Sequence, residues 1–222
     1  MAISLDAVSS KDAGNVSSST LSHPCAADAT MLIVCIAADS AVAPTGITYN
    51  GVSMTKEVEE TVVNTTVWTL ANPATGANDI VVTFAANHYF GIVGMSLKGT
   101  ATSTYIDGTN HGNGATNDAT LSITTGTANS WLVGAGFHNR NSSRTAISGT
   151  TIQGDQYVVT DNFHVLGLTS PTTTAGAYNI GWTMGTPSDG WWFAAIGIKE
   201  NAGGGGSTAL PARSLNLLGV GI

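Results

Sequence analysis

Paired carboxylates can perform acid–base catalysis, and the stretch KEVEE brings three glutamates of this chain together. Glu57 and Glu59 stand two residues apart, so on a β-strand their side chains would share one face. Two carboxylates on one face are what glycoside hydrolysis requires. A strand end with solvated carboxylates explains the same residues without any substrate. The sequence favours this second interpretation, and we do not assign the glutamates to a catalytic site.

A polar segment in the middle of the chain could instead bind a cation. The stretch DGTNHGNGATND holds carboxylate and amide oxygens of the kind that calcium prefers, at Asp107, Asn110, Asn113 and Asp118. It lacks the spacing and the final glutamate of an EF-hand loop, and it lies where two similar halves of the chain meet. We therefore interpret it as a polar connector and predict no metal ion and no cofactor.

Other motifs for catalysis are missing from the sequence. It contains no G-x-S-x-G, no H-E-x-x-H, no paired C-x-x-C and no G-x-G-x-x-G before a helix. The histidines are scattered without metal-ligand spacing. The stretch FHNRNSSR, with Arg140 and Arg144, could contact an acidic partner or form an exposed loop. We therefore expect that the protein is not an enzyme.

Tryptophans are the remaining candidates for ligand recognition, because they combine a large apolar face with a polar N–H group. Trp191 and Trp192 are adjacent, so on a strand they point to opposite faces. If the sheet is covered on one side only, one of them is left for a ligand or a neighbouring subunit. If it is covered on both sides, both belong to the core. The pair is thus a candidate ligand or interface site, with a cell-surface glycan as the candidate ligand.

The composition argues against two classes of partner. Only 9% of the 222 residues are charged, against roughly 25% in average soluble proteins. A net charge of -7 with seven basic residues argues against nucleic acid, which attracts clustered Lys and Arg. The same shortage argues against an anionic membrane surface. No apolar run reaches the roughly 18 residues that span a bilayer.

The N-terminus and the surface composition bear on localisation. MAISLDAVSSKDAG has neither the basic nor the apolar region of a secretory signal. A surface poor in charge and rich in Thr, Gly and Asn is nevertheless common outside cells. A virion component, folded in the host cytosol and released by lysis as part of an extracellular particle, would combine both properties. A mature protein whose signal has been removed is the alternative. Cys25 and Cys35 form no disulfide framework, and Cys35 is expected to be buried.

Internal similarity is the strongest signal in the sequence. The stretch VWTLANPATGANDI, which begins at Val67, matches VLGLTSPTTTAGAYNI, which begins at Val165, with a two-residue insertion. Further matches upstream and downstream keep the same order, about 100 residues apart. The chain thus contains two copies of one unit, 1–100 and 101–200, which together form the domain 1–200.

Each copy is predicted to consist of β-strands. MLIVCIAA is a short apolar run, NTTVWTL alternates, and ITYNGVSMT indicates a hairpin around Asn50-Gly51. No stretch shows a sustained helical period. FGIVGMSLK and WWFAAIGIK are apolar on both faces, so each is expected to be a central strand covered on both sides. We predict an all-β fold, namely an antiparallel β-sandwich of the jelly-roll or immunoglobulin-like kind, built from two pseudo-repeats that pack into one sandwich.

The same elements resemble a known family. GITYNGVSMT, a tryptophan-containing strand, NPATGANDIVVTF and a closing WWFAAIGIK are similar to a β-sandwich domain that recurs in phage structural proteins and bacterial surface proteins. The resemblance covers nearly all of residues 1–200, and its motifs are hairpins and strand endings. It implies a β-sandwich fold, and no catalytic residue is carried over from it.

A tether and an apolar arm end the chain. Residues 201–206 read NAGGGG, and four successive glycines are costly to order. Residues 207–222 form the arm, whose alternating apolar side chains suit addition to an exposed strand edge. The side chains expected to dock are Leu210, Leu215, Leu217, Leu218, Val220 and Ile222.

The sequence therefore predicts a non-enzymatic virion structural protein, such as a phage capsid decoration or a tail or fibre component. Its expected partners are other virion subunits or copies of itself, reached through the arm, with neither nucleic acid nor a membrane involved. The alternative is a carbohydrate- or receptor-binding β-sandwich module that uses Trp191 or Trp192.

Overall fold

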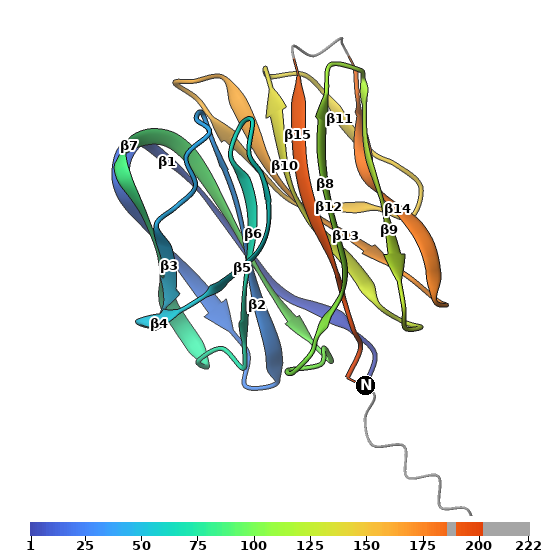
Figure 1. The fold of residues 1–222 in the computed structure, drawn as a ribbon. Helices are drawn as coiled ribbons and strands as arrows, with labels where there is room; N and C mark the ends of the chain where they lie inside the picture. Colours follow the sequence, from blue (N-terminus) through green and yellow to red (C-terminus); the bar gives the residue numbers. More distant parts are fainter. Residues whose placement is uncertain (186–189, 202–222) are drawn as a thin grey trace, which may run out of the picture.

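The computed structural model describes residues 1–185 and 190–201 of the chain. They form fifteen β-strands in three antiparallel sheets (Figure 1). The all-β class that the alternating and apolar runs predict is confirmed. None of the described residues forms a helix, so this part of the chain holds no helix that could cross a membrane.

The first half of the chain forms the seven-stranded sheet. Its neighbours run β4-β3-β7-β2-β6-β5, and β1 pairs with β7. The strands are β1 (Ser4–Cys25), β2 (Ala29–Ala38), β3 (Gly46–Tyr49), β4 (Val52–Ser53), β5 (Thr55–Glu60), β6 (Thr65–Ala71) and β7 (Gly76–Lys98). β1 and β7 pair along nearly their whole length, with register shifts between Leu5 and Ala7, between Asp12 and Gly14, and between Val16 and Ser18. The two strands curve together, so that the sheet curls over its own apolar side chains (Figure 1).

The second half forms two smaller sheets. The five-stranded sheet has the order β12-β13-β10-β15-β8, and the three-stranded sheet has the order β11-β14-β9. Their strands are β8 (Ile106–Gly114), β9 (Asp118–Thr125), β10 (Trp131–Asn139), β11 (Arg144–Ala146), β12 (Thr151–Val158), β13 (Phe163–Pro171), β14 (Gly176–Met184) and β15 (Trp191–Ile198). The polar stretch expected to be a connector is thus mainly the strand β8.

A central apolar cluster packs the seven-stranded sheet against the five-stranded sheet. From the first half, β2 and β7 contribute Ile33 and Met95, and from the second half β10 and β15 contribute Val133 and Ile196. All four side chains are fully buried. Burial of this kind is the main favourable contribution to folding. The two halves of the chain are therefore held together by a shared core.

Two further clusters lie within one half each. Ile92 of β7 faces the first-half cluster inside the curled sheet, and Phe193 of β15 faces the second-half cluster between the five- and three-stranded sheets. Because β7 and β15 also reach the central cluster, both are covered on their two faces. Their two-sided apolar sequences predict this position.

Candidate functional site

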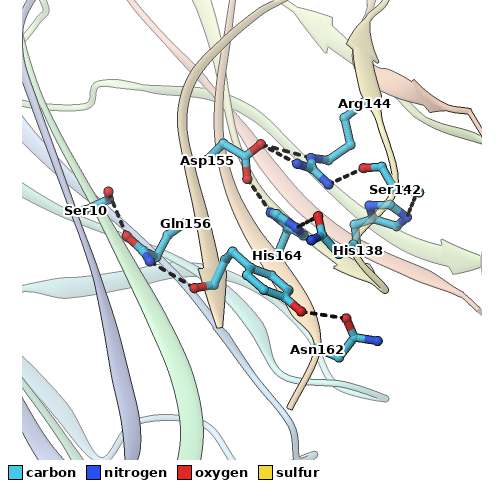
Figure 2. A network of polar contacts seen from close by, with 10 residues as sticks. Ser10, His138, Ser142, Arg144, Asp155, Gln156, Asn162 and His164 are labelled. Atoms are coloured by element: carbon cyan, nitrogen blue, oxygen red, sulfur yellow. Dashed lines mark hydrogen bonds and ion pairs between the residues drawn. The ribbon is translucent and has the colours of Figure 1, made fainter. Parts of the chain in front are cut away.

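Polar side chains gather where β10 ends and the β12–β13 hairpin turns (Figure 2). They come from β10, from the connection that follows it, from β11 and from the strands and the turn of the hairpin, with one residue from β1. We call this set the polar network. Its members are Ser10, His138, Asn141, Ser142, Arg144, Asp155, Gln156, Tyr157, Asn162 and His164.

Asp155 is the centre of the network. Its Oδ1 lies 2.6 Å from His164 Nδ1, and its Oδ2 accepts hydrogen bonds from Arg144 Nε at 3.0 Å and Nη2 at 2.8 Å. Burial alone would raise the pKa of Asp155, but the hydrogen bond from His164 and the charge of Arg144 outweigh it and lower the pKa. The aspartate is therefore ionised and balances the guanidinium charge.

A serine, a histidine and an aspartate lie close together here, yet not in the order that nucleophilic catalysis needs. Ser142 Oγ is 3.2 Å from Nε2 of His138, whereas Asp155 orients His164 instead. In a Ser–His–Asp triad one histidine contacts both partners. Burial and the nearby Arg144 charge also lower the pKa of His138 to about 4, too low for a general base near pH 7. The geometry suits binding and positioning rather than acyl transfer.

The outer part of the network combines an aromatic ring with amide groups. The rings of Tyr157 and His164 stack with centroids 4.7 Å apart and an interplanar angle of 24°. The Tyr157 hydroxyl donates to Asn162 Oδ1 at 2.8 Å, and His164 Nε2 lies 3.2 Å from Asn141 Oδ1. Both asparagines are exposed. These contacts hold the exposed amides in fixed positions.

A β-bulge between Lys56 and Val58 decides where the glutamates of β5 point. Glu57 accepts hydrogen bonds from Thr69 Oγ1 at 2.6 Å and from the Tyr105 hydroxyl at 2.9 Å, on the side of the second half. Glu59 points the other way and binds Lys56 and Asn64. The prediction that Glu57 and Glu59 share a face is therefore wrong.

Glu60 is the third glutamate of this stretch, and it is only 3% exposed. Its carboxylate lies 3.0 Å from His111 Nδ1 and accepts a hydrogen bond from Asn113 Nδ2 at 3.2 Å. Both partners belong to β8, in the segment weighed above as a calcium loop. Asp107 of the same segment binds Thr127 and Ser130. The described residues contain no group of three or more His, Cys, Asp or Glu placed to hold a metal ion.

Trp191 and Trp192 begin β15 and point to opposite faces. Trp191 is 7% exposed, packs in the second-half cluster and donates from Nε1 to Thr116 Oγ1 at 3.4 Å. Trp192 is half-buried against the central cluster and meets Phe137 edge-on, with ring centroids 5.2 Å apart. Because β15 is covered on both sides, both tryptophans pack against core clusters. This arrangement matches the case in which the sheet is covered on both sides and both tryptophans belong to the core.

The last described residue, Asn201, is fixed at the opposite end of the molecule from the polar network. Its N–H donates to Gly99 O at 2.7 Å, and its carbonyl lies 3.4 Å from the Met1 ammonium. In the ladder between β10 and β15, Trp131 pairs with Ile198 and His138 pairs with Trp191. The network and the end of β15 are thus separated by the length of this strand, roughly 20 Å.

The side chains expected to dock from the arm, Leu210, Leu215, Leu217, Leu218, Val220 and Ile222, lie outside the described residues. A hollow of about 430 Å³ lies beside Asn201, lined by Ala101, Thr104, Ala128 and Lys199 among others. Asn201, where the tether begins, therefore lies next to the N-terminus and beside this hollow.

Comparisons with known proteins found no matching family model, no matching curated protein and no matching solved structure. Sequence reasoning alone missed the polar network, although it singled out Arg140, in the loop after β10, and Arg144, the first residue of β11. Asp155 and Tyr157 were not found because they lie in a stretch that matches no known motif. The available signal was that QGDQYVVTDNFH is longer than EVEETVVN, the stretch at the similar place in the first half.

Proposed function

We propose that the protein is a non-enzymatic structural subunit of a virion, such as a phage capsid decoration protein or a tail or fibre component. In this proposal it joins other virion subunits, or copies of itself, through its C-terminal arm. The observation that carries the proposal is the fixed exit of the chain. Glu200 forms a β-bridge with Thr100, and Asn201 donates to Gly99, so the tether starts from a rigid point at one end of the molecule.

A fixed exit point matters because an arm on a four-glycine tether can reach only a limited volume. An extended chain spans at most about 3.3–3.6 Å per residue, so the tether 201–206 places the start of the arm within roughly 20 Å of the exit point. In this proposal the arm docks on a partner at the end that carries Asn201, which leaves the opposite end exposed. Attachment at one end and display of the other is the geometry expected of a decoration or fibre subunit.

We further infer that the two halves are copies of one β-sandwich unit. The pairing β1-β7-β2-β6-β5 has its parallel in β8-β15-β10-β13-β12. Asp6 and Asp107 both stand at a β-bulge in the first strand of these series. Each accepts an N–H from a residue twenty positions further on, Ala26 at 2.9 Å and Thr127 at 3.0 Å. Two bulges with the same side-chain contact support descent from one unit.

The ladders refine the alignment of the copies. Ile33 of β2 and Val133 of β10 stand at equivalent places in the two proposed copies. Ile33 pairs with Thr69, which lies two residues after Val67, and Val133 pairs with Thr169, which lies two residues after Gly167. Val67 therefore corresponds to Gly167 rather than to Val165 when the strands are matched. The two-residue insertion that sequence matching places after these strands is then unnecessary. The additional residues lie instead in the β12–β13 hairpin.

The contacts between the halves also repeat in pairs, as in a twofold dimer, where each surface patch meets its counterpart on the other unit. β5 packs on β8, and β12 packs on β1. Glu60 meets His111 in the first contact, and Gln156 meets Ser10 at 3.0 Å in the second. Glu60 and Gln156 are each the third residue beyond the bulge of their strand. The proposed domain 1–200 thus resembles a dimer of units joined into one rigid block.

Deleting residues 203–222 tests the assembly role. The truncated chain should unfold at the same temperature as the full chain, because all the described core clusters lie before Asn201. It should fail to associate with itself or with the particle from which the full chain is purified. Thermal unfolding and analytical ultracentrifugation measure the two properties. If the truncated chain assembles as well as the full chain, the arm is not the attachment device.

A second candidate is a carbohydrate- or receptor-binding module. The polar network favours it, because exposed amides and an aromatic ring are held in place at the end opposite to the tether. Trp191 and Trp192, which first suggested this function, pack against the core clusters instead. A virion subunit can carry such a site at its displayed end, so the two functions are compatible.

A further inference from the structure

The β12–β13 hairpin is longer than its counterpart in the first half. Beyond the bulge, the β5–β6 ladder has three pairs and ends at Glu60–Thr65. The β12–β13 ladder has two more, Tyr157–His164 and Val158–Phe163. Four-residue turns close both hairpins. Insertions in one copy of a repeat tend to lie in loops on a binding face, so this extension is where a function specific to the second half is expected.

One face of the extension is firmly anchored. Val158 and Phe163 are fully buried in the central cluster, and Phe163 stacks on Phe137 with ring centroids 4.6 Å apart. Residues of the opposite face, Tyr157 and His164, therefore cannot shift without disturbing the core. A site whose side chains are already fixed loses little entropy when a ligand binds.

The opposite face offers hydrogen-bond donors. Asn141 and Asn162 each use Oδ1 within the network, and their Nδ2 groups have no partner among the described residues. Each Nδ2 can donate two hydrogen bonds. His138 adds a buried polar atom, since its Nδ1 is enclosed without a hydrogen-bond partner and the residue is 0% exposed.

The charges at this end decide the class of ligand. Arg144 and Asp155 neutralise each other at 2.8 Å. Asp161 stands in the hairpin turn, where burial and the nearby Asp39 carboxylate raise its pKa. Asp155 and Asp161 would repel a phosphate or another anion, and the Arg144 charge is already balanced by Asp155. Arg140, in the loop after β10, also takes part in another interaction. A ligand with neutral hydroxyl groups suits the amide donors and the aromatic ring.

We propose that the extended β12–β13 hairpin and the loop after β10 form a recognition site for a neutral glycan, with Asn141, Tyr157 and Asn162 as contact residues. The site goes beyond the structural role, and it does not depend on the arm. It lies at the end opposite to Asn201, where attachment through the arm leaves it exposed.

An array of neutral and sialylated glycans, probed with the full chain, tests the proposal. Neutral glycans should bind, and the affinity for a bound glycan should fall about tenfold or more in Asn141→Asp and in Asn162→Asp, as loss of one to two good hydrogen bonds implies. Each change keeps an oxygen at the Oδ1 position that the network uses, replaces the amide donors with a carboxylate oxygen and adds one negative charge. Tyr157→Ala should abolish binding. Thr61→Ala, in the exposed turn of the shorter hairpin, is the matched control and should bind normally.

Thermal unfolding of each variant separates loss of contact from loss of fold, because the two Asn→Asp variants should melt close to the unmodified chain. The chain truncated before residue 203 should still bind the glycan, so the outcome is independent of the assembly proposal. The site is refuted if the full chain binds no neutral glycan, if sialylated glycans bind as well as neutral ones, or if the three variants bind normally.

Discussion

Glu60 and His111 join the two halves of the chain through a contact of 3.0 Å between Oε2 and Nδ1. Glu60 is buried and also accepts from the Val62 N–H at 3.1 Å. Burial would raise the pKa of Glu60, but His111 and the other donors outweigh it and lower the pKa. A buried carboxylate that is kept ionised depends on its partners, because removing one leaves a poorly compensated charge.

The first prediction concerns this pair. A double-mutant cycle with Glu60→Ala and His111→Ala should give a coupling energy of about 0.5–1.5 kcal/mol, reduced by the exposure of the His111 ring. The exposed pair Lys56–Glu59 is the control and should couple by less than about 0.5 kcal/mol. Because the folded pKa of Glu60 is lowered, its contribution is present above pH 4.5 and is lost as the pH falls through the folded value. Equal coupling energies in the two pairs would show that burial of Glu60 does not strengthen its contact with His111.

A second prediction tests the central cluster through Gly91 of β7. A Cβ at this position would lie 2.5 Å from Val165 Cγ2, a side chain of the other half, whereas one at Gly46 would meet nothing within 4 Å. Gly91→Ala should lower the free energy of unfolding by about 1–3 kcal/mol through overpacking. Gly46→Ala should change it by less than about 1 kcal/mol. Urea unfolding measures both, and similar effects at the two sites would argue against close packing of the halves.

The third prediction concerns pH. Burial lowers the pKa of His23 and His138 to about 4, from 6.5. Each is neutral in the folded state and takes up a proton on unfolding below pH 6.5, so its contribution is full above that pH and is lost between 6.5 and 4. The unfolding free energy should therefore fall between pH 7 and pH 5, on the order of 1 kcal/mol for each histidine. His138→Gln should flatten this slope, and an unchanged slope would show that His138 is accessible to protons in the folded state.

Local sequence patterns sufficed for the β elements that bury apolar side chains. The run MLIVCIAA forms all of β2 after its first two residues, and Asn50 and Gly51 take the positive φ values of 48° and 75° that a type I′ hairpin needs. β8 escaped prediction because glycine and asparagine have little intrinsic strand preference. Its pairing with β15 and the contact of His111 with Glu60 are tertiary interactions. No local pattern encodes them.

The candidate site was less accessible to sequence reasoning for a similar reason. His138, Arg144 and Asp155 belong to three different strands, and their meeting depends on the ladders β10–β13, β12–β13 and β11–β14. The bulge in β5 likewise depends on its partner strand, and it separates Glu57 from Glu59. Spacing arguments assume an unbroken alternation of faces, so a single bulge is enough to reverse them.

The last prediction concerns the arm, residues 207–222, and its Leu217 and Asn216. Each fully buried aliphatic side chain contributes on the order of 1.5–3 kcal/mol, whereas ordering the backbone costs about 1–2 kcal/mol per residue. Burial of three or four such side chains overcomes this cost only if strand pairing adds backbone hydrogen bonds, so we expect the arm to pair along an edge. On such a strand Leu217 and Asn216 point to opposite faces. Leu217→Asp should therefore weaken assembly strongly and Asn216→Asp only slightly, as measured by sedimentation at matched concentrations. If the two variants assemble equally well, the arm does not dock as a one-sided strand.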